Sequence, residues 1–209
     1  MTESTRVPGR FIVMAMACLL VVALSGAYIV HLANRSRLAL PVIGQAPPFS
    51  FTERSGTSFG SEQFKGKISV VDFIFTRCTG VCPIMADRMG KLYKAFADYP
   101  NVQFVSITVD PTYDTPAILQ EYATAHGVTD NRWLFLCGPI DSVALVSEKG
   151  LLLPTDSLPQ GHSNRFVLVD SKLQIRGYYS SDDEQSQLLL EHHIRALSTA
   201  MKQFPGAIE

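Results

Sequence analysis

Residues 68–83 read ISVVDFIFTRCTGVCP, and this stretch decides the fold. Its first part, Ile68–Thr76, is a continuous run rich in β-branched and aromatic residues, which predicts a central strand buried on both faces. Pro83–Ala97 is predicted to be a helix, because proline is well suited to the first helical position. Cys78 therefore lies in the loop between the strand and the helix, and Cys82 lies at or near the helix cap.

The rest of the chain supplies a mixed α/β order of elements. The helix after the cysteines carries Met85, Met89, Leu92 and Phe96 at helical spacing, which we interpret as core packing in preference to a methionine copper site. Strand, helix, strand, helix, a terminal hairpin and a last helix predict a thioredoxin-like sandwich, in which helices cover both faces of one central mixed sheet. Further strands are expected at residues 102–109, 133–136, 165–169 and 174–179, and further helices at 115–126, 140–149 and 183–203.

The composition excludes several classes of protein. The chain has 209 residues with 18 basic and 19 acidic side chains, and a formal net charge of −1 offers no electrostatic attraction for nucleic acid. A hydrophobic share of 46% with 12 phenylalanines is incompatible with general disorder. Four cysteines are too few for a disulfide scaffold, so a closely spaced pair indicates redox chemistry or metal binding.

Residues 1–37 are expected to be a targeting segment, and residues 38–209 to form the thioredoxin-like domain. The stretch Phe11–Asn34 is uncharged, and as a helix rising about 1.5 Å per residue it would span about 36 Å, which is enough for one transmembrane helix. The alternative is a cleaved signal peptide, because a basic region precedes this stretch and Ser25-Gly26-Ala27 resembles a small-residue cleavage site. We favour the membrane anchor, since apolar residues continue past the alanine. Both interpretations place the domain outside the cytoplasm.

The cysteine pair has the local setting of reactive thiols. Cys78 and Cys82 lie beside Arg77 at the start of a helix, where the positive end of the helix dipole favours thiolate over thiol. The thiolate is the form that attacks disulfides and binds metals. A structural disulfide or two inert thiols is the alternative, which the strand-loop-helix placement disfavours. The pair alone leaves redox chemistry and metal binding both open.

A histidine favours metal binding. His162 lies in the loop before the predicted strand 165–169, and in a thioredoxin-like sheet this loop approaches the start of the helix that follows the cysteines. Two soft thiolates and an imidazole suit Cu(I) and can also hold Cu(II), while zinc with an open fourth position is an alternative. The other histidines of the domain, which we interpret as solvated residues on helix ends or faces, are His126, His192 and His193.

The chain resembles the Sco/SenC family of copper-binding, thioredoxin-like proteins that help to assemble cytochrome c oxidase. The likeness rests on residues 78–83 (CTGVCP), 109–116 (VDPTYDTP) and 162–163 (HS), and it extends from about residue 43 to the last helix. In that family the two cysteines of the CxxxCP motif and the later histidine are the copper ligands. The resemblance therefore implies a copper site, with a redox-active cysteine pair, made of Cys78, Cys82 and His162.

The same resemblance implies a membrane-tethered copper metallochaperone. Its partner would be the copper-site subunit of cytochrome c oxidase, to which it delivers copper for the dinuclear site and whose cysteines it is able to reduce. A tether makes physical sense, because confinement at the bilayer surface raises the effective concentration towards a membrane-bound partner. Other copper carriers and thiol-disulfide reductants are further candidate partners. The short, Arg-poor leader favours a bacterial periplasm over a mitochondrial intermembrane space.

Other functions are left open by the residues themselves. A thiol-disulfide oxidoreductase would use Cys78 and Cys82 without obligatory copper transfer, and a copper or redox sensor would need an output module that the sequence does not contain. Residues 110–116 either shape the site or its docking surface, or form a turn and a helix cap with Asp114 or Thr115 as the capping residue. Cys137 is interpreted as a buried small residue in preference to a third redox thiol.

Overall fold

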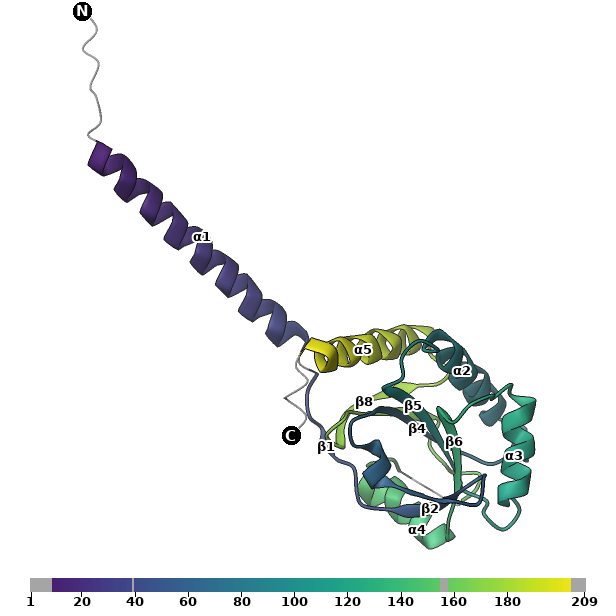
Figure 1. Cartoon of the computed structure of the whole chain (residues 1–209). Coiled ribbons are helices and arrows are strands. Elements are labelled where there is room, and N and C mark those ends of the chain that lie inside the picture. The colour runs from purple at the N-terminus through teal and green to yellow at the C-terminus, as the bar shows by residue number, and fades with distance from the viewer. Residues whose placement is uncertain (1–8, 39, 155–157, 204–209) are drawn as a thin grey trace, which may run out of the picture. The chain divides into compact units, whose positions relative to one another are not determined.

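The computed structural model describes residues 9–38, 40–154 and 158–203. The chain divides into two compact units, Met1–Leu40 and Pro41–Glu209. The second unit contains the sheet (Figure 1). Both cysteines of the CxxxC motif and the histidine of the predicted site also fall within its bounds.

Helix α1 (Gly9–Leu38) covers the uncharged stretch near the start of the chain and is 30 residues long. Among the residues that the structure describes, however, no helix combines the length and the apolar character needed to cross a membrane. The predicted transmembrane helix is therefore not found in this part of the chain.

The second unit is built on one mixed sheet of eight strands in the order β1-β8-β7-β4-β5-β6-β2-β3. Strands β4, β5 and β6 are parallel, whereas β7 lies antiparallel on the other side of β4 and pairs with β8 as a hairpin. Strand β4 is thus central, as its composition predicted. The strands are β1 (Gly44–Gln45), β2 (Ser50–Glu53), β3 (Ser58–Gly60), β4 (Ile68–Ile74), β5 (Val102–Thr108), β6 (Trp133–Cys137), β7 (Arg165–Val169) and β8 (Gln174–Ser180).

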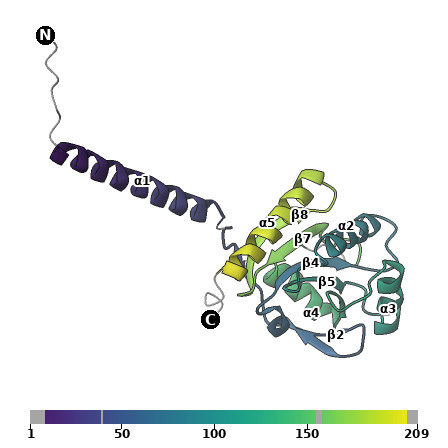
Figure 2. The ribbon, with the colours of Figure 1, turned by 45° about the horizontal axis from the view of Figure 1, so that its top comes forward.

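Helices cover both faces of the sheet, as predicted. Figures 1 and 2 show α2 and α5 along one face and α4 along the other. Trp133 of β6 lies on the face that α2 and α5 cover, with its ring 5.8 Å from the ring of Tyr93 in α2. The helices are α2 (Cys82–Ala95), α3 (Pro116–Ala125), α4 (Ile140–Leu145) and α5 (Glu184–Gln203), with a 3₁₀ turn at Ser61–Phe64 and a π turn at Val146–Gly150.

The core explains why β4 is mostly apolar. All seven residues of the strand are buried, and alternate side chains point to opposite faces. Val71 and Phe73 belong to the cluster that includes Val143 of α4. Burying a side chain of this size contributes about 1.5–3 kcal/mol. On the other face, the stripe predicted to be core is fully or nearly fully buried: Met85, Met89, Leu92 and Phe96.

Several predicted boundaries differ from the observed ones, and hydrogen bonds explain three of the differences. Strand β4 ends before Thr76, because the Thr76 N–H donates to a side chain and not to the sheet. Helix α2 begins at Cys82, one residue early, since the Met85 N–H already donates to the Val81 carbonyl at 3.0 Å. The helix expected at 140–149 changes to a π turn after α4, where the Leu151 N–H donates to the Val146 carbonyl five residues back.

Candidate metal centre

The cysteine loop leaves the carboxyl end of β4 through a tight turn. The Cys78 N–H donates to the Phe75 carbonyl at 3.2 Å, so Thr76 and Arg77 are the two central residues of this turn. Cys78 is half-buried, whereas Cys82 is only 1% exposed at the start of α2. The two thiols therefore meet different surroundings, one facing solvent and the other facing the core.

His162 reaches the same place from the loop before β7. Its ring stands edge-on to Phe75, with the two centroids 5.6 Å apart, and the residue is only 9% exposed. The Sγ atoms of Cys78 and Cys82 and a ring nitrogen of His162 all lie within 4.8 Å of one another. The structure thus brings together the three residues that the sequence analysis singled out.

Hydrogen bonds fix the tautomer of the His162 ring. Its Nδ1 lies 3.1 Å from the Ser163 carbonyl oxygen, which can only accept, so Nδ1 carries the proton. Nε2 is therefore unprotonated, and its lone pair faces Cys82 Sγ at a hydrogen-bond distance of 3.2 Å. Burial also lowers the pKa of this ring, which keeps it neutral. A neutral imidazole that donates its one N–H to a carbonyl and keeps the other ring nitrogen unprotonated is the usual form of a metal-binding histidine.

The two thiols differ in acidity. Partial burial alone would raise the pKa of Cys78, but hydrogen bonding from the Cys82 thiol and from backbone N–H groups at the helix start outweighs it and lowers that pKa. Deeper burial and the neighbouring Cys78 raise the pKa of Cys82. Cys78 is therefore the thiol that ionises first and the one that an incoming group meets first.

The donor set fits a thiophilic ion. Three donor atoms that each lie about 2.0–2.3 Å from one ion are roughly 3.5–4 Å from one another. The donor atoms here lie within 4.8 Å of one another, so they need to approach by only about 1 Å to bind one ion. The site opens to solvent through a cavity of about 340 Å³. Its lining residues are Phe75, Arg77, Cys78, Thr79, Gly80, Val81, Gln160 and His162.

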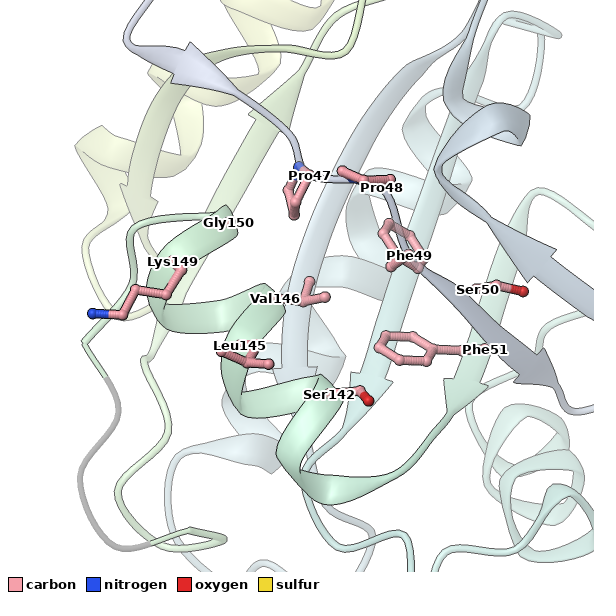
Figure 3. Close-up of a pocket in the computed structure, with 10 residues that line it drawn as sticks. All are labelled: Pro47, Pro48, Phe49, Ser50, Phe51, Ser142, Leu145, Val146, Lys149 and Gly150. Atoms are coloured by element: carbon pink, nitrogen blue, oxygen red, sulfur yellow. The ribbon is translucent and has the colours of Figure 1, made fainter.

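A larger pocket of about 470 Å³ lies elsewhere, between the entry segment and α4 with its π turn. Figure 3 shows Phe49 and Phe51 on one side of this pocket and Val146 on the other. None of the described residues that line it is a cysteine, a histidine or an acid. It therefore offers no groups for redox or metal chemistry.

Asp72 is a buried acid that the sequence analysis did not single out. It is 0% exposed in β4, and neither carboxylate oxygen has a hydrogen-bond partner in suitable geometry among the described residues. Burial raises the pKa of Asp72 to about 7, and the nearby Ser106 hydroxyl, which already accepts a hydrogen bond from Trp133, offsets this only in part. Its charge also raises the pKa of Cys82. The sequence feature that could have revealed this residue is the presence of one acid in a predicted buried strand.

The other histidines of the domain (His126, His192 and His193) and Cys137 lie outside the cluster of Cys78, Cys82 and His162. The prediction that these three histidines are solvated is wrong for His126 and His193, which are partly buried. The His126 ring packs 4.4 Å from that of Tyr122, and His193 Nδ1 shares a hydrogen bond of 2.6 Å with the Tyr179 hydroxyl. Burial lowers the pKa of both rings. Cys137 is half-buried at the end of β6, and burial raises the pKa of its thiol.

A dithiol at the junction of the central strand and a helix, beside an imidazole from the loop before the hairpin, defines a thioredoxin-like protein with a candidate metal centre. The SCO1/SenC family model matches residues 43–197, and the chain belongs to this family. Proteins of the Sco family are associated with cytochrome c oxidase assembly and with copper binding.

Individual relatives agree with this assignment. The SCO1 homologue of Bacillus subtilis is 33% identical over 135 residues, which cover 62% of this chain and 70% of that protein. The structure of BsSco, described as a member of the Sco family of cytochrome c oxidase assembly proteins with a disulfide switch, matches with a TM-score of 0.69 and 26% identity, covering 77% of this chain and 98% of the other. Copper-bound yeast Sco1 matches with a TM-score of 0.56 and 26% identity, covering 71% and 88%. The chain spans less than two thirds of the length of several other curated relatives.

Proposed function

We propose that this protein is a copper metallochaperone that binds copper through Cys78, Cys82 and His162 and delivers it to the dinuclear copper site of cytochrome c oxidase. The observation that carries the proposal is the convergence of two thiols and one unprotonated Nε2 within 4.8 Å. Two thiolates and an imidazole are soft enough to prefer Cu(I) and basic enough to hold Cu(II). The copper ion is the cargo of this site, and the half-buried Cys78 leaves one ligand open to exchange.

The proposal predicts how copper binding depends on the redox state of the cysteines. The reduced chain is expected to bind one copper per molecule, and the chain whose Cys78 and Cys82 are joined as a disulfide is expected to bind far less. The reason is that a thiolate is the ligand and a disulfide sulfur is not. Atomic absorption after gel filtration measures the number of copper ions bound per chain in the reduced form and in the disulfide form. Equal copper content in the two forms would contradict thiolate ligation.

A second function is favoured by the acidity difference between the two thiols. A partly exposed thiol with a lowered pKa beside a buried one with a raised pKa is the arrangement of an attacking and a resolving cysteine. In an oxidoreductase, Cys78 would attack a disulfide of the acceptor, and Cys82 would then release the reduced acceptor as Cys78 and Cys82 join. This activity would reduce the thiols of the acceptor before copper is loaded. It is compatible with the first function, because both functions need Cys78 and Cys82 in the reduced state.

We further propose that residues 1–37 tether the domain, residues 38–209, to a membrane, on the side away from the cytoplasm and most simply in a bacterial periplasm. The support is the uncharged stretch 11–34, which lies within helix α1. The full chain is expected to remain with the membrane fraction after an alkaline wash, whereas a chain shortened to residues 38–209 is expected in the supernatant. Recovery of the full chain in the supernatant would contradict the tether.

A further inference from the structure

We propose that Asp114 is a positioning residue for the copper site and that the 110–114 loop holds the turn that presents Cys78. This inference rests on the proposed function, because it concerns how one of the proposed copper ligands is held. Asp114 is 0% exposed although it lies in a loop. A carboxylate in such a place is costly to bury unless hydrogen bonds satisfy it.

Three hydrogen bonds satisfy the Asp114 carboxylate, and two of them come from one residue of the cysteine turn. Oδ2 accepts from the Thr76 N–H at 3.1 Å and from the Thr108 hydroxyl at 2.5 Å. Oδ1 accepts from the Thr76 hydroxyl at 2.5 Å. Asp114 therefore joins the end of β5 to the first central residue of the turn that follows β4.

The second central residue of that turn is held from the same loop. The Arg77 guanidinium lies 2.6 Å from the Asp110 carboxylate and 4.0 Å from the centre of the Tyr113 ring. Both residues that set the direction of the turn, Thr76 and Arg77, are thus anchored by the 110–114 loop. Because Cys78 follows them directly, its sulfur position depends on these anchors.

The alternative role for Asp114, capping helix α3, is taken by its neighbour. The Thr115 side chain accepts a hydrogen bond from the Ile118 N–H at 3.4 Å, and Thr115 is the residue at the N-cap position. Asp114 points instead towards the cysteine turn. Its carboxylate is therefore available for positioning and is not needed to start the helix.

The test compares two substitutions at one position in the full chain, kept in detergent. Asp114→Ala removes all three hydrogen bonds, so the affinity for Cu(I), measured by competition with a chromogenic chelator, is expected to fall about 10- to 100-fold, the range seen when a partner of a metal ligand is removed. Asp114→Asn keeps the pattern, because its amide oxygen accepts from the Thr76 N–H and its NH₂ donates to the Thr76 hydroxyl. Asn is therefore expected to restore most of the affinity, even though it has lost the charge.

Asp170→Ala is the matched control for a general loss of stability. Asp170 is also buried and accepts two backbone hydrogen bonds, but it follows the carboxyl end of β7, at the opposite end of the sheet from the cysteine turn. Asp170→Ala is expected to lower the free energy of unfolding without changing Cu(I) affinity. Wild-type affinity in Asp114→Ala, or an equal loss in Asp114→Asn, would overturn the positioning role.

A second measurement separates this proposal from the proposed function. The equilibrium between the Cys78–Cys82 dithiol and its disulfide, measured in glutathione buffers, is expected to shift towards the dithiol in Asp114→Ala by about threefold or more, because a less fixed Cys78 has a lower effective concentration near Cys82. If wild type binds no copper while this shift is seen, the copper function fails and the positioning role stands. If wild type binds copper and Asp114→Ala keeps the same Cu(I) affinity, the positioning role fails alone.

Discussion

His162→Ala is expected to lower the Cu(I) affinity of the reduced chain by more than about 100-fold, because it removes a ligand, and removing a mere partner of a ligand already costs about 10- to 100-fold. The structure offers no substitute among the described residues, since the three-residue cluster contains no other histidine or acid. Exchange between Cys78 and glutathione is expected to continue, because the lowered pKa of Cys78 arises from the Cys82 thiol and from backbone N–H groups at the helix start.

His192→Ala is the matched control for this substitution. His192 is an exposed histidine on α5 and not a member of the cluster, so copper affinity and thiol exchange are both expected to stay at wild-type values. Competition with a chromogenic Cu(I) chelator measures the affinity, and alkylation of Cys78 measures its reactivity. Undiminished copper affinity in His162→Ala would remove the imidazole from the proposed site and leave a redox dithiol.

Asp72→Asn is expected to stabilise the fold at pH 8 by roughly 2–4 kcal/mol, since a pKa raised from 3.8 to about 7 corresponds to about 4 kcal/mol against the ionised form. The folded state holds the proton of Asp72 more tightly than the unfolded state does. Stability is therefore unaffected by this group below about pH 4, falls as the pH rises from there to about 7, and stays reduced above it. Asn has no charge to bury, so it escapes this loss.

Unfolding in urea provides the measurement, followed by the fluorescence of Trp133, the single tryptophan, which is 1% exposed. The gain from Asp72→Asn is expected at pH 8 and is expected to vanish near pH 4. Asp98→Asn, at an exposed position, is the matched control and is expected to change little at either pH. A gain of equal size at both values of pH would show that the buried charge is not its cause.

The order of elements could be predicted from the sequence because local patterns determine it. The β-branched and aromatic residues of Ile68–Ile74 favour a buried strand. The apolar stripe that begins at Met85 marks one face of the following helix. One boundary, the end of β4, moved because the Asp114 side chain takes the Thr76 N–H. The start of α2 and the end of α4 moved because of backbone hydrogen bonds.

The candidate site was predictable for a different reason. Two cysteines at this spacing and a histidine before a strand carry their own chemistry, and the fold supplies the proximity. For residues 110–116 the sequence left a site-shaping role and a helix cap both open, because sequence spacing does not show which way a loop carboxylate points. The unpartnered burial of Asp72 was not predicted, because a strand pattern does not show whether a buried acid finds a partner. For the same reason the packing of His126 and His193 was missed, since a helical pattern does not show what lies against each face.

The pairing of β4 with β7 determines how the thiols and the imidazole come to be neighbours. These strands are adjacent and antiparallel, with Ser69 opposite Val169 and Val71 opposite Val167, so the end of one stands beside the beginning of the other. Adjacent strands lie about 4.8 Å apart. The pairing of these two strands thus brings the loop that carries Cys78 beside the loop that carries His162, although the two residues are 84 positions apart in the sequence.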